Sequence, residues 1–129
     1  MSQIKVYDLK NNLNNIKGKL SEVIHPCVVD VFQMPGDKRF YRFFPLDRED
    51  FYFQTNRTEK YTITEVSIFE GRTTEAKKKL IKLLLERIQE ELNIMPNDIE
   101  LTIFETSSHN WGIRGLPGDE LSLNYNIEI

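Results

Sequence analysis

An arginine placed where an extended segment gives way to a helix is the first feature of this chain that suits chemistry. Arg72 follows the segment Tyr61–Phe69 and precedes Thr73, a residue type that often begins helices. A planar guanidinium beside the free amides of a helix start makes a natural carboxylate site. The alternative is a surface arginine that merely begins a helix. Arg72 is thus a candidate for binding a carboxylate, and at this point both interpretations stay open.

A loop rich in glycine and proline holds a second candidate group, Trp111 and Arg114. In a functional interpretation, Trp111 forms an apolar wall beside a substrate and Arg114 makes a second contact to a carboxylate or enolate. In a structural interpretation, Trp111 fills a subunit interface and Arg114 pairs with a carboxylate of the next chain. The sequence leaves both interpretations open.

Other kinds of site find little support in the sequence. The two histidines, His25 and His109, are far apart in the chain, and the lone cysteine, Cys27, falls on an apolar helical stripe, so these residues do not make a metal-ligand set. The chain contains no Gly-x-Gly-x-x-Gly motif, no phosphate-binding Walker loop and no Ser/Cys–His constellation. We therefore expect no metal and no cofactor.

The composition is that of a soluble globular protein, and its 129 residues fit a single domain over residues 1–129. A net charge of -3 gives no general attraction to nucleic acid. The apolar runs are too short to span a membrane. The N-terminal residues lack a signal-peptide profile and Cys27 has no intrachain partner, so we expect a reduced, cytoplasmic protein.

The first half of the chain predicts a strand, a helix and a second strand. The segment Ile4–Leu9 is a strand candidate, Asn11 or Asn12 offers a helix N-cap, and the second strand begins at residue 38. Pro26 is expected to kink this helix or to end it about a turn early. One apolar stripe at helical spacing runs through Leu13, Ile16, Leu20, Val23, Ile24, Cys27, Val28 and Val31.

The second half repeats this plan, with strands at 61–69 and 99–104 around a helix from Thr73 or Thr74 to about Leu92. We therefore predict an α+β fold of two βαβ units, about 3–45 and 61–105, forming a four-stranded mixed sheet with two helices on one face. An insertion occupies about 46–60. The tryptophan–glycine loop and an alternating C-terminal strand, at 121–129, fill about 106–129.

The chain resembles the tautomerase superfamily, whose fold is that of macrophage migration inhibitory factor. The resemblance rests on the early first strand, on Phe69-Glu70-Gly71-Arg72 and on Asn110-Trp111-Gly112-Ile113-Arg114-Gly115. The most similar branch includes malonate semialdehyde decarboxylase. The resemblance implies a homotrimer with each active site in a cleft between neighbouring subunits, and it makes Arg72 the substrate-binding arginine. The decarboxylase's second arginine, two positions earlier, is replaced by Glu70, which reverses the local charge.

The superfamily's catalytic group is an N-terminal proline, and this chain has Ser2 at the matching position. Removal of Met1 would leave a primary amine, with a reference pKa of about 8. An apolar pocket with nearby arginines would bring that pKa toward neutrality, which makes Ser2 a candidate catalytic residue. The alternative is an ordinary start of a strand.

The decarboxylase's assisting aspartate aligns with Lys38, one residue after Asp37. Because a shift of one residue in a strand reverses the side chain's face, Asp37 can serve as a catalytic residue only if the preceding turn is remodelled. Arg39 is an alternative cation for the cleft. All three residues are also compatible with charges at a strand edge.

Two functions from different classes follow from the resemblance. The first is a cofactor-independent isomerase or lyase that acts on a small 2-oxo acid or its enol, with Ser2 or water held by Asp37 moving the proton. The second is a catalytically impaired trimer that binds a small carboxylate or a protein partner. The missing proline favours the second function. The retained Arg72, Trp111 and Arg114 favour the first.

Overall fold

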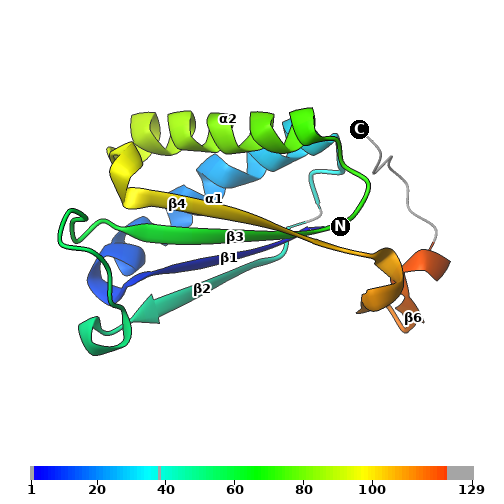
Figure 1. Cartoon of the computed structure of the whole chain (residues 1–129), viewed down its shortest axis with the longest axis horizontal. Helices are drawn as coiled ribbons and strands as arrows, with labels where there is room; N and C mark the ends of the chain where they lie inside the picture. The colour runs from blue at the N-terminus through cyan, green and yellow to red at the C-terminus, as the bar shows by residue number, and fades with distance from the viewer. Residues whose placement is uncertain (1, 38, 122–129) are drawn as a thin grey trace.

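The computed structural model describes residues 2–37 and 39–121 (Figure 1). The first βαβ unit consists of β1 (Ser2–Leu9), α1 (Lys10–Phe32) and β2 (Tyr41–Leu46), and the second of β3 (Thr62–Phe69), α2 (Thr74–Leu92) and β4 (Ile99–Thr106). The smaller elements are the 3₁₀ turns η1 (Arg48–Asp50), η2 (Pro96–Asp98), η3 (Ser108–Asn110) and η4 (Gly118–Glu120), and the strands β5 (Gly112–Ile113) and β6 (Leu116–Pro117).

The four long strands form one sheet in the order β2-β1-β3-β4. Each βαβ unit contributes a parallel pair, and β1 and β3 join the units as antiparallel neighbours. Both helices cover the same face of this sheet (Figure 1). The predicted fold class is therefore confirmed, because strand–helix–strand repeats have to return in parallel to bury a helix against their own sheet.

The main core lies between the helices and the sheet. Alternate residues of β1 and β3 face this core, among them Ile4, Val6, Val66 and Ile68, each no more than 1% exposed. The apolar stripes of both helices meet them, with Leu13, Ile24, Leu80 and Leu84 similarly buried. Period-two strands against period-3.6 helices explain why the sequence pattern predicts this layer.

The insertion between β2 and β3 builds a smaller apolar cluster at the end of the sheet opposite Ser2. Phe51 and Tyr61 are buried there with Leu9, and Phe53 packs against them. The rings of Phe51 and Tyr61 stack with their centroids 5.7 Å apart. This segment is therefore a packed part of the fold at its two ends, and not a loose connection.

Helix α1 begins earlier than its asparagines predict. Its N-cap is Leu9, which offers no capping side chain, and neither Asn11 nor Asn12 caps it. The carboxylate of Asp8 instead accepts hydrogen bonds from the Leu9 amide, at 2.7 Å, and from Asn12 Nδ2, at 2.5 Å. The chain can thus turn from strand to helix without a loop, because an acid at the end of the strand supplies the missing acceptor.

Other boundaries also differ from the prediction. Helix α1 continues past Pro26 to Phe32, so the proline does not end it. Strand β2 begins at Tyr41 rather than at residue 38, because Arg39 and Phe40 still belong to the connection. Apart from Leu121, the predicted C-terminal strand lies outside the described residues. Among the described residues, neither helix is long and apolar enough to cross a bilayer.

Candidate functional site

Ser2 is the first residue of β1 and is only 3% exposed. Its register partner on β3 is Ile68, close to the end of that strand. The Ser2 hydroxyl donates a hydrogen bond to the sulfur of Met34, 3.8 Å away, just beyond the end of α1. The antiparallel pairing of β1 with β3 thus brings the start of the first strand to the end of the third (Figure 1).

Arg72 lies in the turn from β3 to α2 and is buried, with 7% exposure, so it is not a surface residue. Gly71 has a φ of 126°, a backbone conformation that favours glycine, and this lets the chain reverse before Arg72. The Arg72 Nη1 donates to the Phe32 carbonyl at 2.6 Å, and its guanidinium carbon lies 4.6 Å from the centre of the Phe32 ring. Burial lowers the pKa of the guanidinium to about 10, so it remains a cation at neutral pH.

These contacts bring Ser2 and Arg72 to one place. Phe32 ends α1 and Met34 follows two residues later, so one short segment is held by both candidate residues. The Phe32 carbonyl is one of the last carbonyls of α1, where the helix dipole favours a cation. The sequence identified Arg72 but gave no signal for this backbone partner, since a carbonyl carries no residue-type information.

Asp37 and Arg39 lie farther along the same connection, and both are exposed. Arg39 Nη2 donates to Glu22 Oε1 at 3.0 Å and to Ser21 Oγ at 2.9 Å, so its guanidinium is directed to α1. The Arg39 amide donates to the Asp37 carbonyl at 3.0 Å. Asp37 and Arg39, the expected acid and cation, therefore follow Met34, the residue that Ser2 contacts, by only a few positions in the chain. The Arg39 guanidinium, however, is bound to α1 through Glu22.

Trp111 joins this end of the sheet through Phe69, the last residue of β3. The two rings meet edge to face with their centroids 4.9 Å apart. Gly118 is buried against the same ring, because a Cβ on it would lie 3.0 Å from Phe69 Cζ and 2.5 Å from the Ser108 carbonyl oxygen. The tryptophan loop is therefore packed onto the strand that leads to Arg72.

Arg114 sits at the tip of the β5–β6 hairpin and is exposed. It has a φ of 54° and Gly115 a φ of 82°, the left-handed pair of a two-residue hairpin turn. The hairpin was not predicted as such, although the glycine in Arg114-Gly115 is its signal. The structure thus gathers Ser2, Arg72 and Trp111 at one end of the sheet and sets Arg114 on a projection beside them.

Glu70 connects the β3 turn to the tryptophan loop. Its Oε2 accepts a hydrogen bond from the Ser107 hydroxyl at 3.1 Å, and its amide donates to the Thr106 carbonyl at 2.9 Å. The sequence marked Glu70 for its reversed charge. Its contact with Ser107 could not be foreseen, because the pairing joins two separate strand ends.

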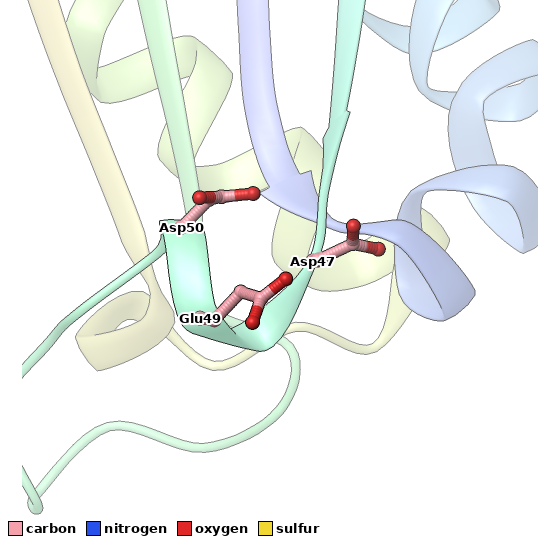
Figure 2. A group of neighbouring side chains, drawn as sticks. All are labelled: Asp47, Glu49 and Asp50. Atoms are coloured by element: carbon pink, nitrogen blue, oxygen red, sulfur yellow. The ribbon is translucent and has the colours of Figure 1, made fainter.

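Among the described residues, one group of side chains meets the spacing of a metal site: Asp47, Glu49 and Asp50 around η1 (Figure 2). One carboxylate oxygen from each lies within 4.8 Å of the others, and all three residues are exposed. Exposed acids often gather at a turn without an ion. The group also lies at the far end of β2 from Ser2 and Arg72, so it has no part in the candidate site (Figure 1).

The chain is similar in sequence to one protein family and to two bacterial proteins. Residues 38–114 match the protein family described as "Tautomerase enzyme". The probable tautomerase YusQ of Bacillus subtilis (strain 168) is 26% identical over 98 residues, covering 72% of this chain and 77% of that protein. The probable tautomerase YrdN of the same bacterium is 31% identical over 98 residues, covering 72% and 75%.

Solved structures share the fold over nearly the whole chain. Native fused 4-OT superposes with a TM-score of 0.82 at 18% identity, covering 92% of this chain and 98% of that one. Malonate semialdehyde decarboxylase gives 0.79 at 19% identity, covering 92% and 99%. An asymmetric trimer of fused 4-OT gives 0.79 at 20% identity, covering 91% and 96%. At such identities the likeness establishes the fold.

Proposed function

The chain belongs to the tautomerase family, and from this premise we propose that it is a cofactor-independent isomerase or lyase acting on a small 2-oxo acid or its enol. One observation carries the proposal: a buried arginine at the end of β3 shares a short segment with the start of β1. A buried cation beside a helix N-terminus is an arrangement that favours binding of a carboxylate.

Each residue of this end of the sheet has a role in the proposed reaction. Arg72 holds the substrate carboxylate, with Arg114 as a second contact, and Trp111 keeps water from the reacting carbon. In ketonisation, a base removes the enol hydroxyl proton while a proton is added to the adjacent carbon. Net charge and atom count do not change, so no oxidant or cofactor is required.

The proton carrier is the least conventional part of this proposal. In the full chain Ser2 is 3% exposed. An amine released there by removal of Met1 would start in largely buried surroundings, which favour its neutral, basic form. Asp37, exposed on the adjacent turn, holds water as the second proposed carrier. Arg39 contributes as a cation only after it leaves Glu22, so its proposed part in binding is secondary.

We further propose that the site is completed in a homotrimer. The hairpin tip sets Arg114 outward, where it can meet a neighbouring subunit. The helix-free face of the sheet carries the stacked pair Tyr7 and Phe44, with ring centroids 4.8 Å apart, and Phe104, which is 47% exposed. Apolar side chains on an open sheet face favour burial against another layer.

A second candidate function is a family member that binds a small carboxylate, or a protein partner, without turnover. Ser2 in place of the catalytic proline favours this alternative. The contact of Arg72 Nη1 with the Phe32 carbonyl also favours it, because a structural duty explains the burial of this arginine without catalysis.

The test is the ketonisation of phenylenolpyruvate by native protein, Arg72→Lys and Ser2→Pro, after the intact mass shows whether Met1 has been removed. Arg72→Lys keeps a cation and a donor for the Phe32 carbonyl but loses the guanidinium fork. We expect native turnover above buffer and at least about a tenfold loss in Arg72→Lys. Arg48→Lys, at the other end of the sheet, is the matched control.

The outcomes separate the two functions. Native activity that survives Arg72→Lys overturns the assigned site. Silence of the native protein combined with activity of Ser2→Pro means that the scaffold is intact and that the alternative function holds. Thermal stabilisation of a silent native protein by phenylpyruvate would then identify a carboxylate binder.

A further inference from the structure

The residues proposed to meet a substrate are covered by other parts of the chain. Ser2 is 3% exposed and Arg72 is 7% exposed. Met34, whose sulfur accepts a hydrogen bond from the Ser2 hydroxyl, is 4% exposed and belongs to the main core. A ligand therefore reaches Ser2 only after part of the surrounding chain has moved.

The segment 33–37, all of it described, follows α1 and lies against Ser2 through Met34. Pro35 joins Met34 to Gly36. A proline ring fixes its own φ and restricts the residue before it, so these three residues move largely as one piece. A contact that holds Gly36 therefore also holds Met34 over Ser2.

Contacts on either side fix the two ends of this segment. Before it, the Phe32 carbonyl accepts a hydrogen bond from Arg72 Nη1 at 2.6 Å. After it, the Phe40 carbonyl accepts one from the amide of Ile4, a buried residue of β1, at 2.9 Å. Movement is therefore confined to the residues between these two carbonyls.

His25 of α1 holds Gly36, which lies between the two ends. The His25 Nε2 is 2.6 Å from the Gly36 carbonyl oxygen. Because a carbonyl can only accept, Nε2 carries the proton and donates it. In the neutral ring Nδ1 is then an acceptor, and the hydroxyl of Tyr41, the first residue of β2, lies 3.4 Å from it. Their rings meet edge to face with centroids 5.9 Å apart, so Tyr41 fixes the imidazole that holds Gly36.

We propose that His25 is a positioning residue, which holds the segment 33–37 closed over Ser2, and that opening of this segment admits the ligand. The proposal rests on the function proposed above. Burial of Met34 in the core also favours the closed form. The contact with Gly36 is nearer the surface, since Gly36 is exposed and His25 half-buried. The closed form lowers the apparent affinity for a ligand in proportion to the fraction of molecules that are open.

A matched pair of substitutions isolates the contact with Gly36. His25→Gln has an amide nitrogen as many bonds from the backbone as Nε2, so it keeps the donor, whereas His25→Asn is one bond shorter and does not reach. Each is combined with Ser2→Cys, and the rate of alkylation at position 2 by iodoacetamide is measured by peptide mapping, which separates it from the buried Cys27. We expect a rate about fivefold to tenfold higher with His25→Asn and unchanged with His25→Gln. His109→Asn, the same change at an exposed histidine of η3, is the control.

The alkylation rates decide whether His25 holds the segment. If His25→Asn leaves the rate unchanged, or if His25→Gln raises it as much as His25→Asn does, the assigned contact is wrong and the proposal fails. A preserved amide spectrum shows that each variant is folded. Tyr41→Phe, which removes the hydroxyl at Nδ1 and keeps the ring, gives a second test: we expect a smaller rise than with His25→Asn, and a rise in neither would overturn the proposal.

Binding of phenylpyruvate to chains that keep Ser2 tests the ligand separately. We expect His25→Asn to bind phenylpyruvate about fivefold more tightly than the native chain, because less of it is closed, and His25→Gln to bind as the native chain does. If alkylation responds as expected but phenylpyruvate binds to none of these proteins, the proposed function fails while the hold of His25 on the segment stands. If phenylpyruvate binds equally to all three and alkylation does not respond, the function stands and the proposal for His25 fails.

Discussion

The two βαβ units turn from strand to helix in opposite ways. In the first unit β1 runs directly into α1, and the turn buries an acid, Asp8, with 0% exposure. In the second unit four residues separate β3 from α2, and the turn buries a base, Arg72, with 7% exposure. Because β1 and β3 are antiparallel, these turns lie at opposite ends of the sheet.

This difference shows how one topology serves two purposes. The Asp8 carboxylate accepts hydrogen bonds from Leu9 and Asn12 and so replaces the cap that α1 lacks. The second turn has a regular cap, Thr73, whose hydroxyl accepts from the Ala76 amide at 3.1 Å. Arg72 precedes that cap, and its guanidinium, which can only donate hydrogen bonds, contacts the end of the other helix at the Phe32 carbonyl. The longer turn therefore places a buried cation at the end of β3, where the shorter one places an acid that serves its own helix.

The largest expected effect concerns the acid of the first turn. Burial raises the pKa of Asp8 to about 7 from a reference value of 3.8. The folded state thus binds this proton more tightly than the unfolded chain, so stability falls as pH rises from about 4 to about 7, by up to about 4 kcal/mol. Denaturant unfolding across this window measures the slope. In Asp8→Asn the fall in stability between about pH 4 and pH 7 should disappear. In the control variant Asp30→Asn, which changes an exposed acid, the fall should remain.

A smaller loss is expected at the base of the second turn. Arg72→Ala removes the donor to the Phe32 carbonyl and the packing on the Phe32 ring, which should lower the free energy of unfolding by about 3 kcal/mol. Arg72→Lys keeps a cation and a donor and should lose about half as much. If neither Arg72→Ala nor Arg72→Lys lowers the free energy of unfolding in urea, the contact of Arg72 with Phe32 does not stabilise the fold.

The packing of the tryptophan loop can be tested independently of the contact between Arg72 and Phe32. Gly118→Ala would place a Cβ 2.5 Å from the Ser108 carbonyl oxygen, so the loop has to shift, at about 2 kcal/mol. Trp111 is the only tryptophan of the chain, so its exposure can be followed by fluorescence. We expect acrylamide to quench this fluorescence more strongly in Gly118→Ala. Gly112→Ala meets no atom within 4 Å and is the matched control. Unchanged quenching in Gly118→Ala would contradict this packing.

The smallest effect distinguishes the two helix starts. Thr73→Ala should lower stability by about 1 kcal/mol, because it removes the cap of α2. Asn11→Ala should change stability by less than about 0.5 kcal/mol, since Asn11 does not cap α1. Thermal unfolding of both variants suffices. A clear loss in Asn11→Ala would restore the capping role that its sequence position suggests.

Much of this fold could be predicted because it follows from periodicity. Alternation in β1 and β3 and the stripes of α1 and α2 each identify a buried face without knowledge of the partner. The start of α1 was misjudged because the acceptor that replaces its cap sits on the preceding strand, in Asp8. Of the two effects expected of Pro26, the early end of α1 does not occur, because tertiary packing of the stripe through Phe32 outweighs a local helix breaker.

The candidate site was predictable by residue type and less so by contact. Arg72 and Trp111 stand out from their neighbours, whereas the Phe32 carbonyl that holds Arg72 belongs to another element. Arg39 could not be foreseen to join Glu22, because that pairing needs the β2 connection to fold back on α1.

The central antiparallel pairing also bears on how the chain folds. Within each βαβ unit a strand pairs with the next one across a single helix, as Ile4 does with Tyr41 and Thr62 with Ile99. The contact between the units instead joins Ser2 to Ile68, across both the first helix and the insertion. Closing that larger loop costs more chain entropy, so docking of the two halves should limit the folding rate. The candidate site, which is built from both halves, would then be among the last regions of the molecule to form.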